Sequence, residues 1–128
     1  MSKKILSIVD TAYRATLEEQ DDTSLWFNHA CKNAGAPIDI LLTGNAVNYA
    51  VKSQNPQALH FGTGEIPHPN HFQEDLKNFK KTGANVFFLK DDLEERGIKA
   101  TELIKEIEGI SRAQLARFVD QYDHIWHW

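Results

Sequence analysis

The sequence has little cysteine, since Cys31 is the only one in 128 residues. A single thiol excludes an internal disulfide, a Cys-x-x-Cys redox pair and a zinc site built from several cysteines. Long hydrophobic runs are also missing near the start of the chain. The apolar run at residues 5–9 is far shorter than a secretory or membrane-spanning segment and is closed by Asp10. We therefore expect a cytoplasmic protein with no membrane partner.

Positive charge is in short supply as well. The chain has 14 Lys and Arg residues against 18 Asp and Glu, a net charge of −4, so no diffuse positive field exists to gather phosphates or anionic lipid. Nucleic acid is therefore not an expected partner. The hydrophobic share of 41% and the charged share of 25% are typical of a folded globular protein. A length of 128 residues suits a single domain spanning residues 1–128.

Short apolar runs alternate with helical patterns along the chain. We predict strands at residues 5–9, 38–42, 85–89, 107–110 and 123–128. We predict one helix that starts near residues 21–24 and ends near residue 34. Further helices are predicted at residues 46–51, 72–81, 91–97, 98–106 and 111–122. This alternation favours an α/β fold, a mostly parallel open sheet with helices on both faces in flavodoxin-like layers. The strand at residues 5–9 is expected to be the central one.

Residues 53–70 lack periodicity and are predicted to form one long irregular loop, which is usually functional, mobile or an interface. His60 and His68 fall in this loop, and His71 follows it. A metal ion would need two imidazoles from His68-x-x-His71, with Pro69 between them, and a further ligand from His60 or Glu65. We interpret these side chains as solvated loop histidines; a metal-binding protein using His60, His68 and His71 is an alternative.

Ligands of open α/β sheets bind beyond the carboxyl ends of the strands, so a site is expected among the residues that follow the predicted strands. These candidates for a ligand-binding site are Asp10, Thr11, Thr43, Gly44, Asn45, Lys90 and Asp91. The stretch 43–45 also falls at a predicted helix start, where free backbone N–H groups favour an anion or a carbonyl oxygen, although any strand-to-helix turn needs such residues. Gly-x-Gly-x-x-Gly and phosphate-loop patterns are absent, which disfavours nucleotide binding by those routes, and no cofactor is expected.

Cys31 is the only candidate for a thiol nucleophile. It lies late in its predicted helix, on the apolar stripe with Phe27 and Ala34, where the helix dipole opposes formation of a thiolate. This placement favours a buried structural cysteine.

At the other end of the chain, Trp126 and Trp128 belong to a predicted edge or final strand, where exposed indoles would need cover. We expect Trp126 to pack within the chain and Trp128 to be the better candidate for a subunit contact.

Three stretches together resemble the DsrE/DsrF-like family of small sulfur-relay proteins. They are Ile-Asp-Ile-Leu-Leu-Thr-Gly-Asn-Ala-Val at 38–47, Gly-Ala-Asn-Val-Phe-Phe-Leu at 83–89 with Asp-Leu-Glu-Glu-Arg-Gly-Ile at 92–98, and Tyr-Asp-His-Ile-Trp at 122–126. The resemblance covers most of the chain except 53–70. It implies an α/β fold with about five strands, assembly into dimers, trimers or hexamers, and a sulfur-relay partner protein. In active members, a cysteine after the third long strand carries the persulfide.

That segment, residues 88–93, reads Phe-Leu-Lys-Asp-Asp-Leu here and contains no cysteine. A persulfide requires a sulfur atom, and no Asp, Lys or Leu side chain replaces a thiolate in its transfer. We therefore expect a DsrE-like oligomeric protein without sulfurtransferase activity that binds a small ligand or a partner protein at the strand ends. A sulfurtransferase or sulfur carrier that uses Cys31 is the alternative.

Overall fold

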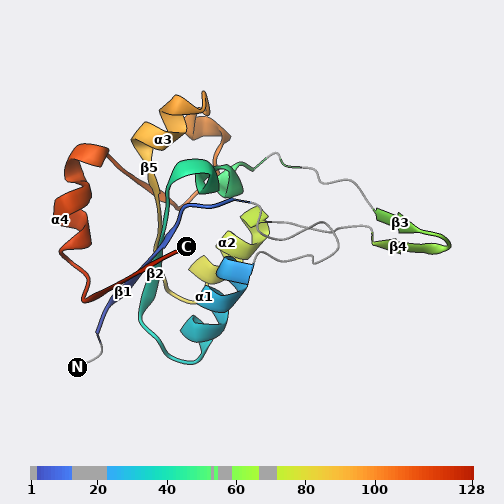
Figure 1. Cartoon of the computed structure of the whole chain (residues 1–128), viewed down its shortest axis with the longest axis horizontal. Coiled ribbons are helices and arrows are strands. Elements are labelled where there is room, and N and C mark those ends of the chain that lie inside the picture. Colours follow the sequence, from blue (N-terminus) through green and yellow to red (C-terminus); the bar gives the residue numbers. More distant parts are fainter. Residues whose placement is uncertain (1–2, 13–22, 53, 55–58, 67–71) are drawn as a thin grey trace.

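The structure is a computed structural model, and it describes residues 3–12, 23–52, 54, 59–66 and 72–128 (Figure 1). Its centre is a five-stranded sheet in which every pair of neighbours is parallel. The order of the strands is β6 (Glu108–Ile110), β5 (Val86–Leu89), β2 (Ile38–Leu42), β1 (Ile5–Val9) and β7 (His124–His127). The predicted parallel α/β sheet is confirmed.

Helices cover both faces of this sheet, as predicted. The helices α1 (Thr23–Asn33) and α2 (Phe72–Lys80) and the 3-10 helix η1 (Gly44–Ala50) pack on one face. The short helix α4 (Leu115–Val119) packs on the other face, so the sheet separates it from α1 and α2 (Figure 1). The remaining helices are α3 (Lys90–Glu95), η2 (Ala100–Glu102) and η3 (Arg112–Gln114).

The core follows from the two-residue period of the strands. In β2, Ile38, Ile40 and Leu42 point into the large cluster beneath α1, η1 and α2. Leu41 points the other way, into a smaller cluster under α4. All four side chains are almost completely buried, which explains why this strand is a continuous apolar run interrupted only by Asp39.

The expectation that residues 5–9 form the central strand is wrong, because β2 holds that place and β1 lies one position towards the edge. The runs in β1 and β2 are similarly apolar, so their composition does not indicate which of the two strands is central. The order is set by β7, which pairs with the free side of β1 and forms the edge of the sheet. The prediction that the final strand is an edge strand is confirmed.

Residues 53–70 are not one irregular loop, since they contain a two-stranded antiparallel hairpin. Its strands are β3 (Leu59–Phe61) and β4 (Gly64–Ile66). Gly62 has φ of +60°, the left-handed region that a tight hairpin turn uses, and glycine enters it without strain. The hairpin stands away from the sheet (Figure 1).

Three predicted helices are shorter or tighter than expected. The one at 46–51 is the 3-10 helix η1, the one at 98–106 is reduced to the single turn η2, and the one at 111–122 is divided between η3 and α4. After η2 the chain extends, and Leu103 forms an antiparallel bridge with Val51. This pairing offers the backbone an alternative to continued helix.

Candidate functional site at the strand ends

Asp10, Thr43 and Gly44 meet where the neighbouring strands β1 and β2 end. The Thr43 hydroxyl donates a hydrogen bond to Asp10 Oδ1 over 2.8 Å. Gly44 has φ of +52°, and a Cβ at this position would lie 2.5 Å from Asp10 Oδ1. Only glycine lets the backbone pass this close to the Asp10 carboxylate. Three of the residues that the sequence predicted at this edge therefore lie together in the structure.

The backbone N–H at the start of η1 is already bonded within the protein. The Gly44 N–H donates to Asp92 Oδ2 over 2.7 Å, and Asp92 is only 8% exposed. The position at which we expected a ligand anion or carbonyl oxygen therefore has a carboxylate of the chain itself beside it. Favourable charge at a helix start explains why an acidic side chain is stable there.

Asp92 is the centre of a polar network that the sequence reasoning missed. Arg112 Nη2 lies 2.8 Å from Asp92 Oδ1, an ion pair between α3 and η3. Arg96 donates through Nη1 to the Asp92 carbonyl over 3.1 Å and through Nε to Asn45 Oδ1 over 2.9 Å. One signal was available, because Asp92 directly follows the predicted site residue Asp91, just beyond the end of β5. Arg96 and Arg112 gave no comparable signal.

The other predicted site residues lie around this network. Asp91 Oδ1 accepts the Arg112 backbone N–H over 2.8 Å. The Thr11 N–H donates to the Trp128 carbonyl over 3.3 Å, which ties Thr11 to the end of β7. Lys90 is exposed, and its stem lies across Gly109 of β6, where an added Cβ would come within 2.7 Å of Lys90 Cε. Thr11 and Lys90 therefore do not join the Asp92 network in the part of the chain described.

A pocket of about 430 Å³ opens beside the end of β5. Phe88, Leu93 and Ile98 supply its apolar surface, while Lys90, Glu94 and Lys99 supply its charges; Ala100 completes the lining. Pockets that bind small molecules combine these two elements, an apolar wall and a few polar groups that orient the ligand. The lining of this pocket contains both elements.

Comparison with known proteins decides the family. The model of the DsrE/DsrF-like family matches residues 3–127. The chain belongs to this family. Among solved structures, the YchN protein of Escherichia coli is 21% identical, with a TM-score of 0.74 over 98% of this chain and 99% of that one. MTH1491 of Methanobacterium thermoautotrophicum, titled a protein of unknown function, is 12% identical, with a TM-score of 0.60 over the same shares of the two chains. No curated protein matches.

The DsrE-like fold places residues 88–93 at the junction of β5 and α3, and Phe88, Lys90 and Leu93 of this segment line the pocket just described. Cys31 lies elsewhere, on α1, where it is partly buried against the large core cluster. It is absent from the lining of this pocket. The expected burial of Cys31 is therefore only partial.

The metal alternative has little geometric support. Within residues 3–12, 23–52, 54, 59–66 and 72–128, no three His, Cys, Asp or Glu side chains lie close enough together to hold an ion. His60 is exposed on the hairpin, while His68 and His71 lie outside the described residues, so metal binding through these three stays a prediction.

Every helix in the described part of the chain is too short or too polar to cross a bilayer.

Proposed function

We propose that this protein is a DsrE-like subunit that binds a small ligand at the carboxyl edge of its sheet and does not carry sulfur. The observation that carries the proposal is the pocket beside β5. The segment that provides a relay cysteine in active relatives lines this pocket here with Phe88, Lys90 and Leu93. An ammonium group stands in a region where a thiolate would be required, so the scaffold supports recognition and not persulfide transfer.

The residues that line the pocket also favour a negatively charged ligand with an apolar part. Lys90 and Lys99 outnumber Glu94, and the apolar wall borders all three. A small carboxylate with an aliphatic tail meets both requirements. A partner protein that presents an acidic side chain beside an apolar one is the other occupant for this edge.

Hexanoate is a suitable probe, with hexylamine as the control of opposite charge. We expect hexanoate to shift the backbone amide NMR signals of residues 88–100 in isotope-labelled protein and hexylamine to leave them unchanged. A Lys90→Gln variant should lose the response, whereas Lys3→Gln, at an exposed lysine outside the pocket, should retain it. Equal responses to both probes, or a response in Lys90→Gln as strong as in the native protein, would contradict the proposal.

The absence of sulfur transfer has its own test. The protein is incubated with a cysteine desulfurase and cysteine, and its intact mass is measured beside that of Cys31→Ser. We expect no stable gain of a sulfur atom in either protein, because Cys31 packs against the core. A gain that disappears in Cys31→Ser would establish the alternative function, sulfur transfer through Cys31.

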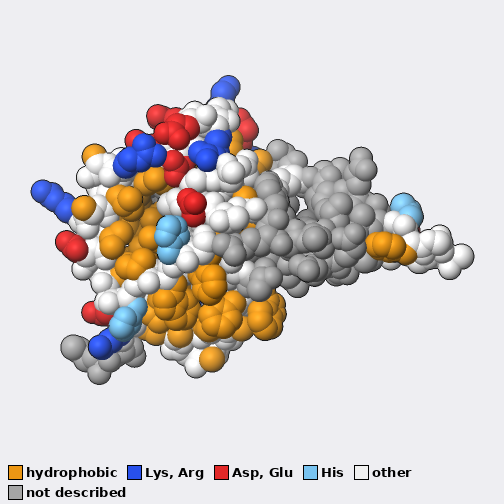
Figure 2. Space-filling view, viewed as in Figure 1, with side chains coloured by type: hydrophobic (Ala, Val, Ile, Leu, Met, Phe, Trp, Pro, Cys, Tyr) orange, Lys and Arg blue, Asp and Glu red, His pale blue; other side chains and the backbone are white. Residues whose placement is uncertain are grey.

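A second proposal, self-association, rests on the side chains around the edge strand β7. Ile125 is 41% exposed. On the opposite face of the strand, the half-exposed Phe27 ring lies 5.9 Å from that of Trp126 and 5.7 Å from that of Trp128. Figure 2 shows hydrophobic side chains gathered between α1 and α4, where β7 runs. An apolar surface next to an unpaired strand edge favours a second copy of the chain.

Light scattering after size exclusion tests this second proposal. We expect the native protein to form an oligomer and Ile125→Asp to shift it towards the monomer, since a buried unpaired carboxylate is costly at an interface. Phe61→Asp is the matched control, because Phe61 is 54% exposed on the hairpin, away from β7. A native protein that is monomeric at micromolar concentration would refute the proposal.

A further inference from the structure

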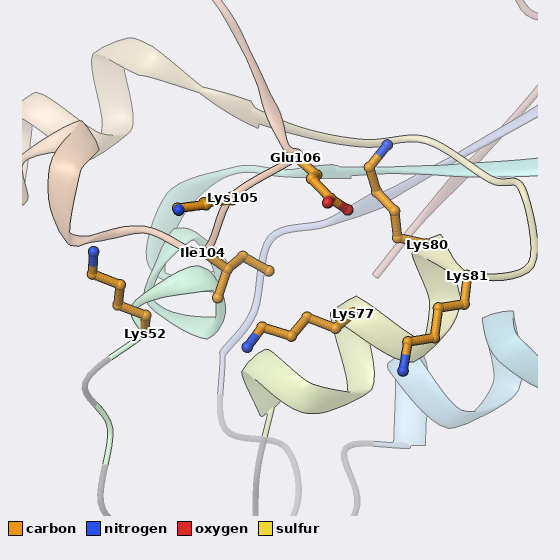
Figure 3. Close-up of a pocket in the computed structure, with 7 residues that line it drawn as sticks. All are labelled: Lys52, Lys77, Lys80, Lys81, Ile104, Lys105 and Glu106. Atoms are coloured by element: carbon orange, nitrogen blue, oxygen red, sulfur yellow. The ribbon is translucent and has the colours of Figure 1, made fainter.

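A second pocket, of about 450 Å³, has an unusual concentration of positive charge. Five lysines line it, namely Lys52, Lys77, Lys80, Lys81 and Lys105, together with Ile104 and Glu106 (Figure 3). They are five of only 14 Lys and Arg residues in a chain whose net charge is −4. The field that the whole molecule lacks is therefore present locally.

Three separate segments position these lysines. Lys77 and Lys80 lie on α2 with Lys81 directly after it, while Lys52 follows η1 and Lys105 precedes β6. The latter two segments are held side by side by backbone hydrogen bonds. The Lys52 N–H donates to the Glu102 carbonyl over 2.9 Å, and the Ile104 N–H donates to the Ala50 carbonyl over 2.8 Å. Figure 3 shows Ile104 and Glu106 between the lysines of α2 and those of the paired segments.

The positive charges of this pocket are mostly unneutralised. Lys77 forms an ion pair with Glu74 over 3.2 Å. No carboxylate of the described stretches lies within ion-pair distance of Lys52, Lys80, Lys81 or Lys105. Of the lining residues that the structure describes, Glu106 is the only acid. Like charges gathered around one cavity repel one another, and an anion bound between them relieves that repulsion.

Backbone geometry supplies an independent observation. Glu106 has φ of +73°, and it is the only residue other than glycine in the left-handed region among those the structure describes. A glutamate in this conformation is strained, and strain of this kind concentrates at ligand sites. The conformation lies next to Lys105 at the wall of the pocket.

We propose that this pocket binds a compact polyanion of the polyphosphate class. Lysine ammonium groups are point charges with freely rotating donors, which suit the oxygens of a chain of phosphates. Among the described residues of the lining there is no aromatic side chain on which a base would stack, and Ile104 is the only apolar residue. Recognition is therefore directed at the phosphates themselves. The site is separate from the pocket beside β5, and neither proposal depends on the other.

Calorimetric titration of the full protein with inorganic triphosphate tests the proposal. The variant is Lys52→Gln with Lys105→Gln. Both side chains are exposed and form no ion pair with another described residue, so the fold is expected to survive. The control, Lys3→Gln with Arg117→Gln, removes the same charge from exposed positions outside the pocket. We expect the dissociation constant to rise at least about tenfold in the variant and to stay within about twofold in the control.

Further arms of the titration separate the possible outcomes. Orthophosphate should bind more weakly than triphosphate, added salt should weaken both, and a nucleoside triphosphate should bind about as tightly as inorganic triphosphate. Equal thermal unfolding midpoints of the two variants would show that both are folded. The proposal is overturned if triphosphate fails to bind at millimolar concentration, if both variants weaken binding equally, or if the nucleoside makes a large contribution to affinity.

Discussion

A side-chain hydrogen bond joins the segment after α4 to the middle of the sheet. The Tyr122 hydroxyl, just beyond α4, donates to Asp39 Oδ2 of β2 over 2.7 Å. The other carboxylate oxygen of Asp39 accepts the Asn85 N–H over 2.9 Å, directly before β5. Burial, the hydrogen bond and the nearby negative charge all raise the pKa of Tyr122 well above its ordinary value of 10.0. Asp39 is thereby accommodated in an otherwise apolar strand.

Replacing Tyr122 by Phe should lower the free energy of unfolding by about 1–2 kcal/mol at neutral pH, because a hydrogen bond to a carboxylate is lost. The folded state holds the phenolic proton more tightly than the unfolded state does, so this stabilisation is complete below about pH 10 and decreases as the pH rises further. Urea unfolding between pH 7 and pH 11 checks both statements. Parallel pH profiles of the native protein and Tyr122→Phe would contradict the second.

Gly44 allows a matched pair of substitutions. Gly44→Ala places a Cβ 2.5 Å from Asp10 Oδ1 and also requires an unfavourable positive φ. Gly83→Ala requires a positive φ of +90° but meets no atom within 4 Å. We expect Gly44→Ala to be more destabilising than Gly83→Ala, which itself should lose about 1–2 kcal/mol. Chemical denaturation of the two variants measures the difference, and equal losses would show that Asp10 moves aside freely.

At the scale of elements, α1 contains a buried polar side chain whose burial does not stabilise the folded protein. Asn28 is fully buried, and neither its amide nitrogen nor its amide oxygen has a hydrogen-bond partner in the part of the chain that the structure describes. Replacing Asn28 by Leu, which has a similar volume, should leave the thermal midpoint unchanged or raise it, because an unsatisfied polar group is removed. Asn28→Ala is the comparison and should lower the midpoint by leaving a cavity. A clear loss in Asn28→Leu would contradict this account.

Elements that are buried on both faces were the easiest to predict from the sequence. The strands β1, β2 and β5 are short apolar runs for that reason. The hairpin was missed because each of its strands has three residues and its exposed residues include His60 and Glu65, so no apolar alternation marks it. The strand order depends on which element reaches the free side of β1, and this is a property of tertiary packing.

The sequence likewise predicted only part of the candidate site. Asp10, Thr43 and Gly44 were found because neighbouring parallel strands end at one edge of a sheet. Arg112 reaches Asp92 only because β6 pairs with β5 and brings the start of η3 beside α3. Neither local pattern nor composition contains that information. The lysine pocket was missed for a similar reason, since its charges come from three segments that are distant in the sequence.

At the scale of the whole molecule, β1 and β7 join the two ends of the chain. Ser7 lies opposite Trp126 in the paired strands, and Trp128 Nε1 donates to the buried Ser7 Oγ over 2.9 Å. The Trp128 carbonyl accepts the Asp10 N–H over 3.0 Å, so β7 also supports the loop that positions the site.

Removal of residues 123–128 should therefore abolish the cooperative thermal transition seen by circular dichroism, because β1 loses its neighbour and the core loses two indoles. Removal of residues 1–2 from the other end is the control and should leave the transition unchanged. A truncated protein that unfolds cooperatively near the native midpoint would show that β7 is dispensable.

The pairing of β1 with β7 also affects how the molecule is made. A ribosome produces β1 before any other strand and β7 after all of them, while β1 ends up between β2 and β7. During translation one side of β1 therefore has unsatisfied hydrogen-bonding groups until β7 emerges from the exit tunnel. A strand edge that stays unpaired in this way is exposed to pairing with other chains until β7 is added.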